Sequence, residues 1–395
     1  MRIAMIAPVE MRVPPVAYGG TELVVSLLTE ELVRRGHDVT LFASGDSVTS
    51  ARLVSVCDRF VRGSGRDGGI LTMLNVLACA EQSDQFDIIH NHTCFEGLSV
   101  AGLVSTPMLT TLHGGLQGDW LLLFKHYAGW YNTISVAMKA ALPPKDRFAG
   151  VIYNAVDVDS YPFNEGSRGE HLLFLSRISF EKGPHLAIEA ARRAGLPLVI
   201  AGNVHPADAE YFRTMVLPEV DGRQIRYVGE ADYHAKRELL ADARCLLAPI
   251  TWPEPFGLFM AEAMACGTPV VAFNRGAAPE VVAHGVTGFV VETLDEMVEA
   301  IGRVDGVDPA ACREHVRARF DVPRMADDYL AAYERILAAA PRRASTSPTL
   351  VAKLPIDEDR RPVYGNGAAA VLPAAEGSKL AQMTPLAGHN IGDAA

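Results

Sequence analysis

Two glutamates, Glu254 and Glu262, stand with seven residues between them in the most informative stretch of this chain, Trp252 to Pro269 (WPEPFGLFMAEAMACGTP). Pro253 and Pro255 flank the first glutamate. Because a residue before proline is disfavoured in the helical region, we expect Glu254 to lie in an extended loop. The residues that follow favour a helix, so we expect Glu262 one to two turns inside it. One carboxylate then lies at the mouth of a helix and the other along its wall.

A helix that begins at Phe256 or Gly257 and ends at Gly267-Thr268-Pro269 has its N-terminus between the two carboxylates. If all the intervening residues were helical, the two glutamates would be about 12 Å apart, roughly the reach of a sugar joined through a diphosphate to a ribose. The free N–H groups at a helix N-terminus favour an anion. The stretch therefore predicts a sugar-nucleotide site. One glutamate would hold sugar hydroxyls, the other would hold ribose hydroxyls, and the backbone N–H groups would hold the phosphate.

Two cations, Arg177 and Lys182, are placed for the same chemistry. They stand five positions apart at the end of a predicted strand, in the segments Leu175-Ser176-Arg177 and Glu181-Lys182-Gly183. Two cations on one loop at the carboxyl end of a strand can clamp a diphosphate. They can also stabilise the charge that builds on it as the sugar bond breaks.

A glycine pair, Gly19-Gly20, follows the first predicted strand and opens the first predicted helix. Glycines at such a turn let a phosphate approach the backbone, and the helix end supplies N–H groups. The pattern is not the G-x-G-x-x-G sequence of dinucleotide-binding folds, which weakens an oxidoreductase interpretation. The pair is a weak signal alone and gains meaning from the other segments.

Five segments between Gly19 and Pro269 resemble, in order, those of the retaining glycosyltransferases of family 4, the glycogen-synthase-like or group 1 glycosyltransferases, which have the GT-B fold. The resemblance covers roughly residues 1–338. Ser176 and Ala155 replace glycines that are more usual in the family, and both cations are intact. The opening segment also resembles a subgroup related to antibiotic and polysaccharide glycosyltransferases. The five segments are Gly19-Gly20-Thr21-Glu22, Thr111-Leu112-His113-Gly114, Asn154-Ala155-Val156-Asp157, Ser176-Arg177 with Glu181-Lys182-Gly183, and Trp252–Pro269.

The resemblance implies a metal-independent enzyme that moves a hexose, with retention, from a nucleoside-diphosphate sugar to an acceptor. A UDP-sugar is favoured as the donor. The implied site has four groups: Arg177, Lys182, Gly19 and Gly20 at the diphosphate, Glu254 and His113 at the sugar, Glu262 at the ribose, and Phe256, Gly257 and Leu258 presenting backbone to sugar and phosphate. The segment Asn154–Asp157 is expected at a hinge or cleft lining, and Glu280 is expected to be structural.

Two patterns that suggest metal ligands are discounted. Asp157 and Asp159 spell a D-x-D sequence, but they lie in the hinge-like segment, and GT-B enzymes generally work without a bound metal. His90 and His92 alternate at a strand end, with no nearby cysteine and no H-E-x-x-H pattern. We therefore expect no metal site and no cofactor, the nucleotide sugar being a co-substrate.

Composition excludes other classes. The formal net charge of −11 and the pI near 5.6 argue against a nucleic-acid-binding protein. No run approaches the roughly 18 apolar residues of a transmembrane helix, and the N-terminus lacks a signal peptide. Six scattered cysteines without a C-x-x-C pair predict core residues in a reducing cytoplasm. We therefore expect a cytoplasmic protein without a transmembrane segment.

Alternating short apolar runs and amphipathic segments predict an α/β protein of GT-B type, with two tandem Rossmann-like, doubly wound domains facing a deep cleft. Residues 1–160 are expected to form the acceptor-side domain and residues 161–320 the nucleotide-sugar domain. Residues 321–340 are expected to form a helix that crosses back to the first domain, and residues 341–395 a disordered tail. Strands are predicted at 2–7, 39–43, 87–91, 108–112, 132–135, 150–153, 172–176, 198–201, 225–228, 245–249 and 270–273, with helices at 21–35, 183–194, 208–217, 234–242, 257–266 and 321–338.

The acceptor carries no readable pattern, and a sugar, a lipid-linked molecule or another small molecule all fit. The expected acceptor loops are residues 9–17, 61–69 and 116–126. Four aromatic residues are candidates for an acceptor face, although core packing is the favoured role: Phe124, Tyr127, Trp130 and Tyr131.

Three alternative functions remain. A carboxylate-pair glycosidase needs no phosphate clamp and has carboxylates about 5–10 Å apart. A GT-B nucleotide-sugar epimerase shares the donor site without an acceptor. A catalytically silent sugar-nucleotide-binding module need not keep both cations and both glutamates.

Overall fold

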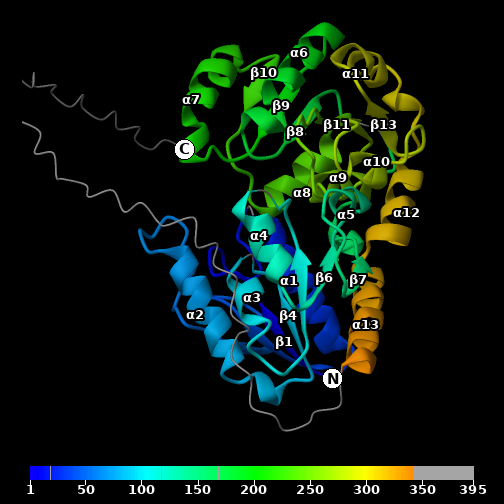
Figure 1. Ribbon diagram of the computed structural model, residues 1–395. Coiled ribbons are helices and arrows are strands. Elements are labelled where there is room, and N and C mark those ends of the chain that lie inside the picture. Colours follow the sequence, from blue (N-terminus) through cyan, green and yellow to red (C-terminus); the bar gives the residue numbers. More distant parts are fainter. Residues whose placement is uncertain (18, 94, 117, 167–168, 341–395) are drawn as a thin grey trace, which may run out of the picture. The chain divides into compact units, whose positions relative to one another are not determined.

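The computed structural model describes residues 1–340, except residues 18, 94, 117 and 167–168. The described residues form a seven-stranded and a six-stranded sheet, both parallel (Figure 1). The two sheets confirm the predicted pair of Rossmann-like α/β domains. The first has the order β3-β2-β1-β4-β5-β6-β7, with β1 Arg2–Ile6, β2 Asp38–Phe42, β3 Arg52–Val54, β4 Ile88–Asn91, β5 Met108–Leu112, β6 Trp130–Thr133 and β7 Phe148–Val151. The second has the order β10-β9-β8-β11-β12-β13, with β8 Leu172–Leu175, β9 Leu198–Ala201, β10 Ile225–Tyr227, β11 Cys245–Ala248, β12 Val270–Phe273 and β13 Gly288–Val291.

Helices connect the strands, as the predicted alternation requires. In the first half these are α1 Gly20–Arg34, α2 Gly68–Ala80, α3 Phe95–Val100, α4 Asp119–His126 and α5 Val136–Ala140. In the second half they are α6 Pro184–Ala194, α7 Ala209–Tyr211, α8 Tyr233–Asp242, α9 Leu258–Ala265, α10 Ala278–Val281, α11 Leu294–Ile301, α12 Pro309–Phe320 and α13 Val322–Ala339.

Central strands were the easiest elements to predict. Strands β8, β9, β11 and β12 are buried at every position, because a parallel sheet covered on both faces needs continuous apolar runs. The edge strands β3 and β13 were missed. Strand β3 is only three residues long and partly exposed, and β13 begins at a glycine after a turn-like sequence.

The single helix predicted for residues 208–217 is wrong in detail. A one-turn α7 is followed by a turn of π-helix at Phe212–Val216 and a 3₁₀ turn at Leu217–Glu219. Pro218 has no N–H to donate to the carbonyl oxygen four residues earlier, so a regular α-helical hydrogen bond is lost there. The regular helix therefore cannot continue through this segment.

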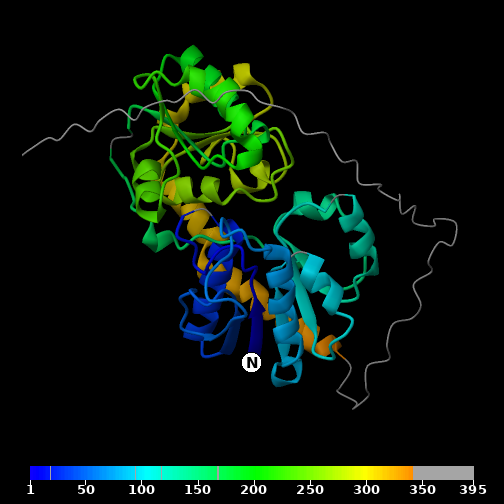
Figure 2. The same cartoon turned by 90° about the vertical axis from the view of Figure 1, so that its left-hand side faces the viewer.

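Helix α13 packs against the first sheet and α1, although it follows the second sheet in the chain. Its residues Met325, Tyr329 and Tyr333 are buried with Val24 and Leu28 of α1. Figure 2 shows this helix in orange beside the blue N-terminal elements. The backbone N–H of Val156 donates to the Phe320 carbonyl oxygen (2.8 Å), so the two passages of the chain between the sheets lie side by side.

The predicted disordered tail, residues 341–395, lies outside the described residues. Within residues 1–340, less the gaps named above, no helix is long and apolar enough to cross a membrane. The free and buried cysteines are Cys57, Cys79, Cys245, Cys266 and Cys312, and Cys94 is not described.

The strand orders fix where a ligand site can form. The order reverses between β1 and β4 in the first sheet and between β8 and β11 in the second. Loops that leave the carboxyl ends of such neighbouring strands diverge and open a crevice. The predicted site residues lie after β1, β5, β8 and β11, three of which border these reversals.

Candidate functional site

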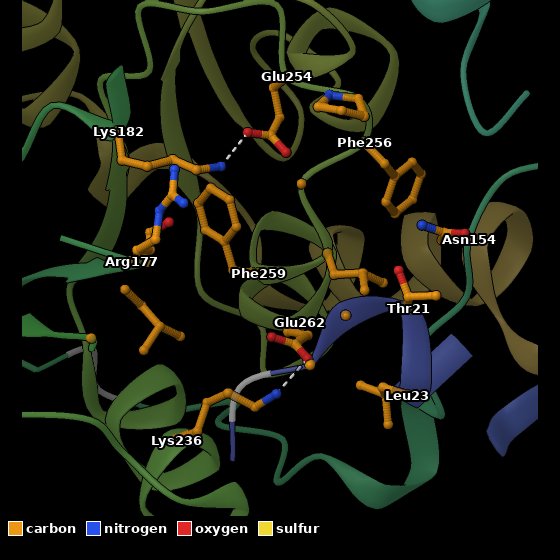
Figure 3. Close-up of a pocket in the computed structure, with 18 of the residues that line it drawn as sticks. Thr21, Leu23, Asn154, Arg177, Lys182, Lys236, Glu254, Phe256, Phe259 and Glu262 are labelled. Carbon is orange, nitrogen blue, oxygen red and sulfur yellow. Dashed lines mark hydrogen bonds and ion pairs between the residues drawn. The ribbon is translucent and has the colours of Figure 1, made fainter. Parts of the chain in front are cut away.

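One cavity of about 400 Å³ gathers every predicted site residue. It is lined from both sheets, and Figure 3 shows part of its wall. The predicted residues among its lining are Gly19, Gly20, His113, Arg177, Lys182, Glu254, Phe256, Gly257, Leu258 and Glu262. Residues that are up to 243 positions apart in the sequence, from Gly19 to Glu262, therefore line the same cavity.

Lys182 and Glu254 form an ion pair at one end of the cavity. The Lys182 Nζ lies 2.5 Å from the Glu254 Oε2, and the Trp252 Nε1–H donates to the same oxygen at 3.0 Å (Figure 3). The Lys182 ammonium also lies over the Trp252 and Phe259 rings, 5.2 and 5.9 Å from their centroids. Glu254 is 7% exposed. A pair this secluded interacts more strongly than a surface pair, and removing one partner leaves a buried charge.

Arg177 stands beside this pair with a guanidinium that is not fully engaged. It forms an ion pair with Glu181, and its Nε lies 3.9 Å from the Asp208 Oδ2. That buried Nε has no hydrogen-bond partner among the described residues. Its side chain is half-exposed. Arg177 thus keeps donor capacity at the cavity wall, as an anion clamp requires.

Two glycines bring the charged loops together. Gly183 follows Lys182 in the left-handed region (φ 75°), and a Cβ there would lie 2.2 Å from the Pro249 carbonyl oxygen. Gly276 (φ 58°) approaches Glu254 so closely that a Cβ would lie 2.2 Å from the Glu254 backbone nitrogen. Both sites exclude a side chain. Gly276 was not predicted, since nothing in the sequence shows that residues 254 and 276 meet.

Two helix N-termini face the cavity. Helix α1 begins at Gly20 after Gly19, and α9 begins at Leu258 after Gly257, and neither helix has a side-chain cap. A Cβ built on Gly20 would lie 3.4 Å from the Leu258 Cδ1, so the two helix ends nearly touch. The first N–H groups of each helix lack intrahelical acceptors. Together they place partial positive charge on two sides of the cavity, an arrangement that favours an anion.

Glu262 lies at the other end of the cavity and is 3% exposed. Its Oε1 accepts from the Lys236 Nζ at 2.6 Å (Figure 3). The same oxygen accepts from the Tyr161 hydroxyl at 2.8 Å. Burial, together with the Glu262 charge, raises the pKa of Tyr161. Tyr161 therefore stays a donor. Tyr161 and Lys236 both donate to the Glu262 Oε1, so the described contacts leave the Oε2 available to a ligand hydroxyl.

Several lining residues were missed by sequence reasoning or left out of the predicted site. Asn154 is buried, lines the cavity and has an Oδ1 without a partner among the described residues. It was expected to line the cleft and was given no contact. Thr21, Lys236, Trp252, Phe259 and Asn203 also line the cavity. Thr21, Trp252 and Phe259 lie in segments with recognisable sequence patterns, whereas nothing in the sequence pointed to Lys236 or Asn203.

His113 ends a buried chain of histidines. Its Nε2 lies 2.8 Å from the His92 Nδ1, and the His92 Nε2 lies 3.3 Å from the His90 Nδ1. The His90 Nδ1 is also 2.6 Å from the Tyr333 hydroxyl of α13. Burial lowers the pKa of His113 to about 4 and holds the pKa values of His90 and His92 well below their ordinary value. All three rings are therefore neutral at pH 7.

One hydroxyl fixes the His90 end of this chain. Thr111 Oγ1 donates its single hydrogen to the Asn132 Oδ1 (2.7 Å), so it must accept from the His90 Nε2 (2.7 Å). The His90 Nδ1 then accepts, and the Tyr333 hydroxyl donates to it at 2.6 Å. We expect the His92 Nε2 (3.3 Å) to donate to the same nitrogen, which makes the His92 Nδ1 an acceptor and the His113 Nε2 a donor to it. The His113 Nδ1, which has no partner among the described residues, is left as an acceptor.

We expect ring nitrogen NMR signals of His90, His92 and His113 to show the neutral Nε2–H form from pH 8 down to about pH 5.5. An Nδ1–H signal for His113, or protonation of any of these rings above that pH, would contradict the assignment.

The lowered pKa values of His90, His92 and His113 also make the free energy of unfolding depend on pH. In the unfolded chain these histidines bind protons below about pH 6.5. In the folded chain burial lowers the pKa of His113 to about 4 and holds the pKa values of His90 and His92 well below their ordinary value. The free energy of unfolding should therefore fall as the pH drops below about 6.5. The slope should reach about 4 kcal/mol per pH unit for three such groups. Urea denaturation at pH 7.5, 6.0 and 5.0 measures it.

The patterns that were discounted have other roles. Asp159 is exposed and pairs with Arg317 (2.6 Å), outside the cavity lining. Glu280 accepts the backbone N–H groups of Val136 and Ala137 (both 2.8 Å), so it caps α5 across the two halves of the chain. Within the described residues, no cluster of His, Cys, Asp or Glu is arranged to hold a metal ion.

Two family models match the chain in tandem. The model described as Glycosyltransferase Family 4 matches residues 18–160, and the model described as Glycosyl transferases group 1 matches residues 159–304. Together they span the chain from the Gly19-Gly20 loop past Glu262, and so include every residue of the candidate site.

Known proteins resemble the chain over most of their own length. Glycogen synthase of Mycobacterium tuberculosis is 27% identical over 386 residues, covering 80% of this chain and 89% of that protein. AviGT4, a glycosyltransferase involved in avilamycin A biosynthesis, has a TM-score of 0.68 at 24% identity. The match covers 86% of this chain and 98% of AviGT4. HepE of Anabaena, solved with UDP and glucose, has a TM-score of 0.65 at 20% identity. The match covers 85% of this chain and 100% of HepE.

Proposed function

Since the chain belongs to the group 1 glycosyltransferases of GT-B fold, we propose that it transfers a hexose, with retention, from a nucleoside-diphosphate sugar to an acceptor hydroxyl. UDP is the proposed nucleotide, with support from the UDP and glucose bound in the HepE structure.

The observation that carries the proposal is the distribution of charge along one cavity. Positive groups lie between the two carboxylates: Arg177 and the N-termini of α1 and α9, with the Lys182 ammonium beside Glu254 and the Lys236 ammonium beside Glu262. Carboxylates stand at the two ends, Glu254 at one and Glu262 at the other. A nucleoside-diphosphate sugar has the matching order, with polyol, diphosphate and ribose in sequence. An anion between two hydroxyl-bearing rings therefore suits the order of these groups along the cavity.

The proposed step forms one bond and breaks one. The acceptor oxygen bonds to the anomeric carbon on the face that the diphosphate leaves, and the bond from that carbon to the diphosphate oxygen breaks. Its electron pair stays on the nucleoside diphosphate, and the acceptor hydroxyl proton passes to the departing oxygen. Lys182, Arg177 and the helix N-termini stabilise the charge that grows there.

The remaining residues position the donor. Glu254 accepts hydrogen bonds from sugar hydroxyls, and the His113 Nδ1 accepts another. Asn154 brings its unpartnered Oδ1 to the same wall. Glu262 accepts from the ribose hydroxyls. The protein's own cations supply the positive charge in this proposal, so transfer is expected to continue in the presence of EDTA.

The first test is thermal unfolding of the purified protein with UDP, GDP, ADP, dTDP and uridine. UDP at about 100 times its dissociation constant should add about 2.7 kcal/mol to the free energy of unfolding. Uridine, which lacks the diphosphate, should shift the melting temperature far less, because the cations have nothing to bind. Equal shifts for UDP and uridine would reject the diphosphate site. No shift with any nucleotide would reject the proposal.

A further inference from the structure

A second cavity, of about 720 Å³, adjoins the proposed donor cavity. The two share four lining residues: Thr21, His113, Gly114 and Trp252. The remaining lining comes from the first half of the chain, at Pro8, Glu10, Gly68, Gly69, Thr72, His92, Thr93, Phe95, Glu96, Leu98, Thr111, Leu112, Gly115, Leu116 and Trp120. A molecule bound in the second cavity could contact a sugar in the donor cavity only beside these four shared residues.

An aromatic pair forms one wall of this second cavity. Phe95 at the start of α3 and Trp120 in α4 pack edge to face, with centroids 5.4 Å apart and an interplanar angle of 84°. Phe95 is 41% exposed and Trp120 is 38% exposed. Pockets for small molecules combine such apolar surfaces with a few polar groups. Of the four aromatic residues considered for an acceptor face, Phe124, Tyr127 and Tyr131 are buried in the core, which was the favoured role, and Trp130 is partly buried against the core of the first sheet.

The charges that line this cavity are all negative. Glu10 and Glu96 are its carboxylates, and its described lining includes no lysine or arginine. His92 and His113 also line it, and burial lowers both of their pKa values, so neither adds positive charge at pH 7. The first cavity, by contrast, holds Arg177, Lys182 and Lys236.

Glu10 is the carboxylate best placed to act on a ligand. It is partly buried, and no ion pair to a described residue neutralises it. Its Oε1 lies 1.6 Å from where a Cβ on Gly68 would be, so the glycine makes room for it at the start of α2. The positive end of a helix favours a negative charge there.

Two neighbouring cations do not reverse this balance. Arg62 is exposed, its backbone N–H donates to the Glu10 carbonyl oxygen (3.1 Å), and its side chain is not part of the cavity lining. Arg12, in the loop after β1, does not line the cavity either.

We propose that this second cavity binds the acceptor, and that the acceptor is an uncharged or amine-bearing sugar or similar polyol rather than a phosphorylated or carboxylated one. The proposal rests on the first cavity being the donor site. A polyol ring would place its C–H face on Phe95 and Trp120 and its hydroxyl or amino groups on Glu10 and Glu96. An anionic acceptor would face carboxylates with no cation in the described lining.

The junction between the cavities is where the two ligands would meet. Thr21, His113, Gly114 and Trp252 line both cavities, so a hydroxyl of a molecule in the second cavity can approach a donor sugar there. In the proposed step this hydroxyl gives its proton to the departing oxygen, and the His113 Nδ1 remains a contact for the donor sugar.

The test measures binding of three probes to the full chain saturated with UDP: methyl glucoside, glucosamine and glucose 6-phosphate. Ligand-observed NMR titration gives the dissociation constants. We expect the first two to bind at least about tenfold more tightly than the phosphate, the effect of one unit-charge repulsion in a partly buried site. Tight binding of glucose 6-phosphate, or no binding of any probe while UDP still binds, overturns the proposal.

Two variants locate the effect. Glu10→Gln should reduce the preference for glucosamine over glucose 6-phosphate by about tenfold, since one of the two lining charges is removed. Trp120→Ala should weaken methyl glucoside binding by about tenfold through loss of the aromatic surface. Leu122→Ala is the matched control, because Leu122 is 55% exposed on the same helix and lines neither cavity. Unchanged probe binding in Glu10→Gln and Trp120→Ala overturns the proposal.

The UDP-induced shift in melting temperature separates the two proposals. It should persist in all three variants, which also shows that they are folded. If wild-type protein shows no UDP shift, the donor site itself has failed. If UDP binds normally and the probes do not behave as stated, only the acceptor class has failed.

Discussion

Lys182→Ala should lower kcat by about 10²- to 10³-fold, the cost of removing one preorganised charge from a developing oxyanion. The Lys182 ammonium is held by Glu254 at 2.5 Å and by two aromatic faces, so it needs little rearrangement when charge grows on the diphosphate. Because the charge increases from ground state to transition state, kcat should fall more than the affinity for the donor. Single-turnover rates and UDP dissociation constants separate the two effects.

The ion pair complicates this variant, since Glu254 would be left as a buried carboxylate. Breaking a buried pair from one side costs about 3–5 kcal/mol of stability. The double variant Lys182→Ala with Glu254→Gln removes both charges, and it should recover stability without recovering kcat. Wild-type kcat in folded Lys182→Ala protein would contradict the assigned role. Recovery of kcat in the double variant would show that the loss came from misfolding.

The central features of the fold were open to prediction because they are local. Strand β12 reads as an apolar run between turn residues, and α9 begins after a glycine and ends before Gly267. The predicted helix at residues 321–338 depended on the same kind of pattern and corresponds to α13. Elements β3 and β13 lie at sheet edges, where burial is incomplete or the strand is short, so the periodic signal is weak.

The candidate site shows a different limit. Loops at the carboxyl ends of parallel strands were expected to converge, so the gathering of Gly19, His113, Arg177 and Glu254 follows from topology. The partners that hold these residues come from distant elements and have no sequence signal. Lys236 reaches Glu262 from α8, for example, and Gly276 makes room for the Glu254 backbone.

The histidine chain illustrates the same point for chemistry. The sequence places His90 and His92 at the end of a predicted strand. Nothing in the sequence connects them to Tyr333, which is more than 240 positions away from His90. Only the packing of α13 on the first sheet brings the tyrosine to the His90 ring. The hydrogen-bonded chain that ends at His113 thus includes a hydroxyl from a helix that follows the second sheet.

Glu262→Ala should raise the dissociation constant for UDP by about 10- to 100-fold. A hydrogen bond to a charged group contributes about 1.5–3 kcal/mol, and the variant removes the carboxylate proposed to accept from the ribose. The rate of the chemical step at saturating donor should change much less, because the ribose lies away from the reacting bond. The kinetic signature is therefore a raised KM for the donor with a largely retained kcat, the opposite of Lys182→Ala.

A ribose contact has one consequence that a merely structural role lacks. Wild-type protein should bind UDP more tightly than 2′-deoxy-UDP, whereas Glu262→Ala should bind both nucleotides equally. Glu238→Gln is the matched control, since Glu238 is an exposed carboxylate on α8 and lines neither cavity. Tyr161→Phe removes one of the two groups that grip Glu262 Oε1 and should weaken the preference for UDP without abolishing it. If Glu262→Ala still prefers UDP to its deoxy analogue as strongly as wild type, Glu262 does not contact the ribose.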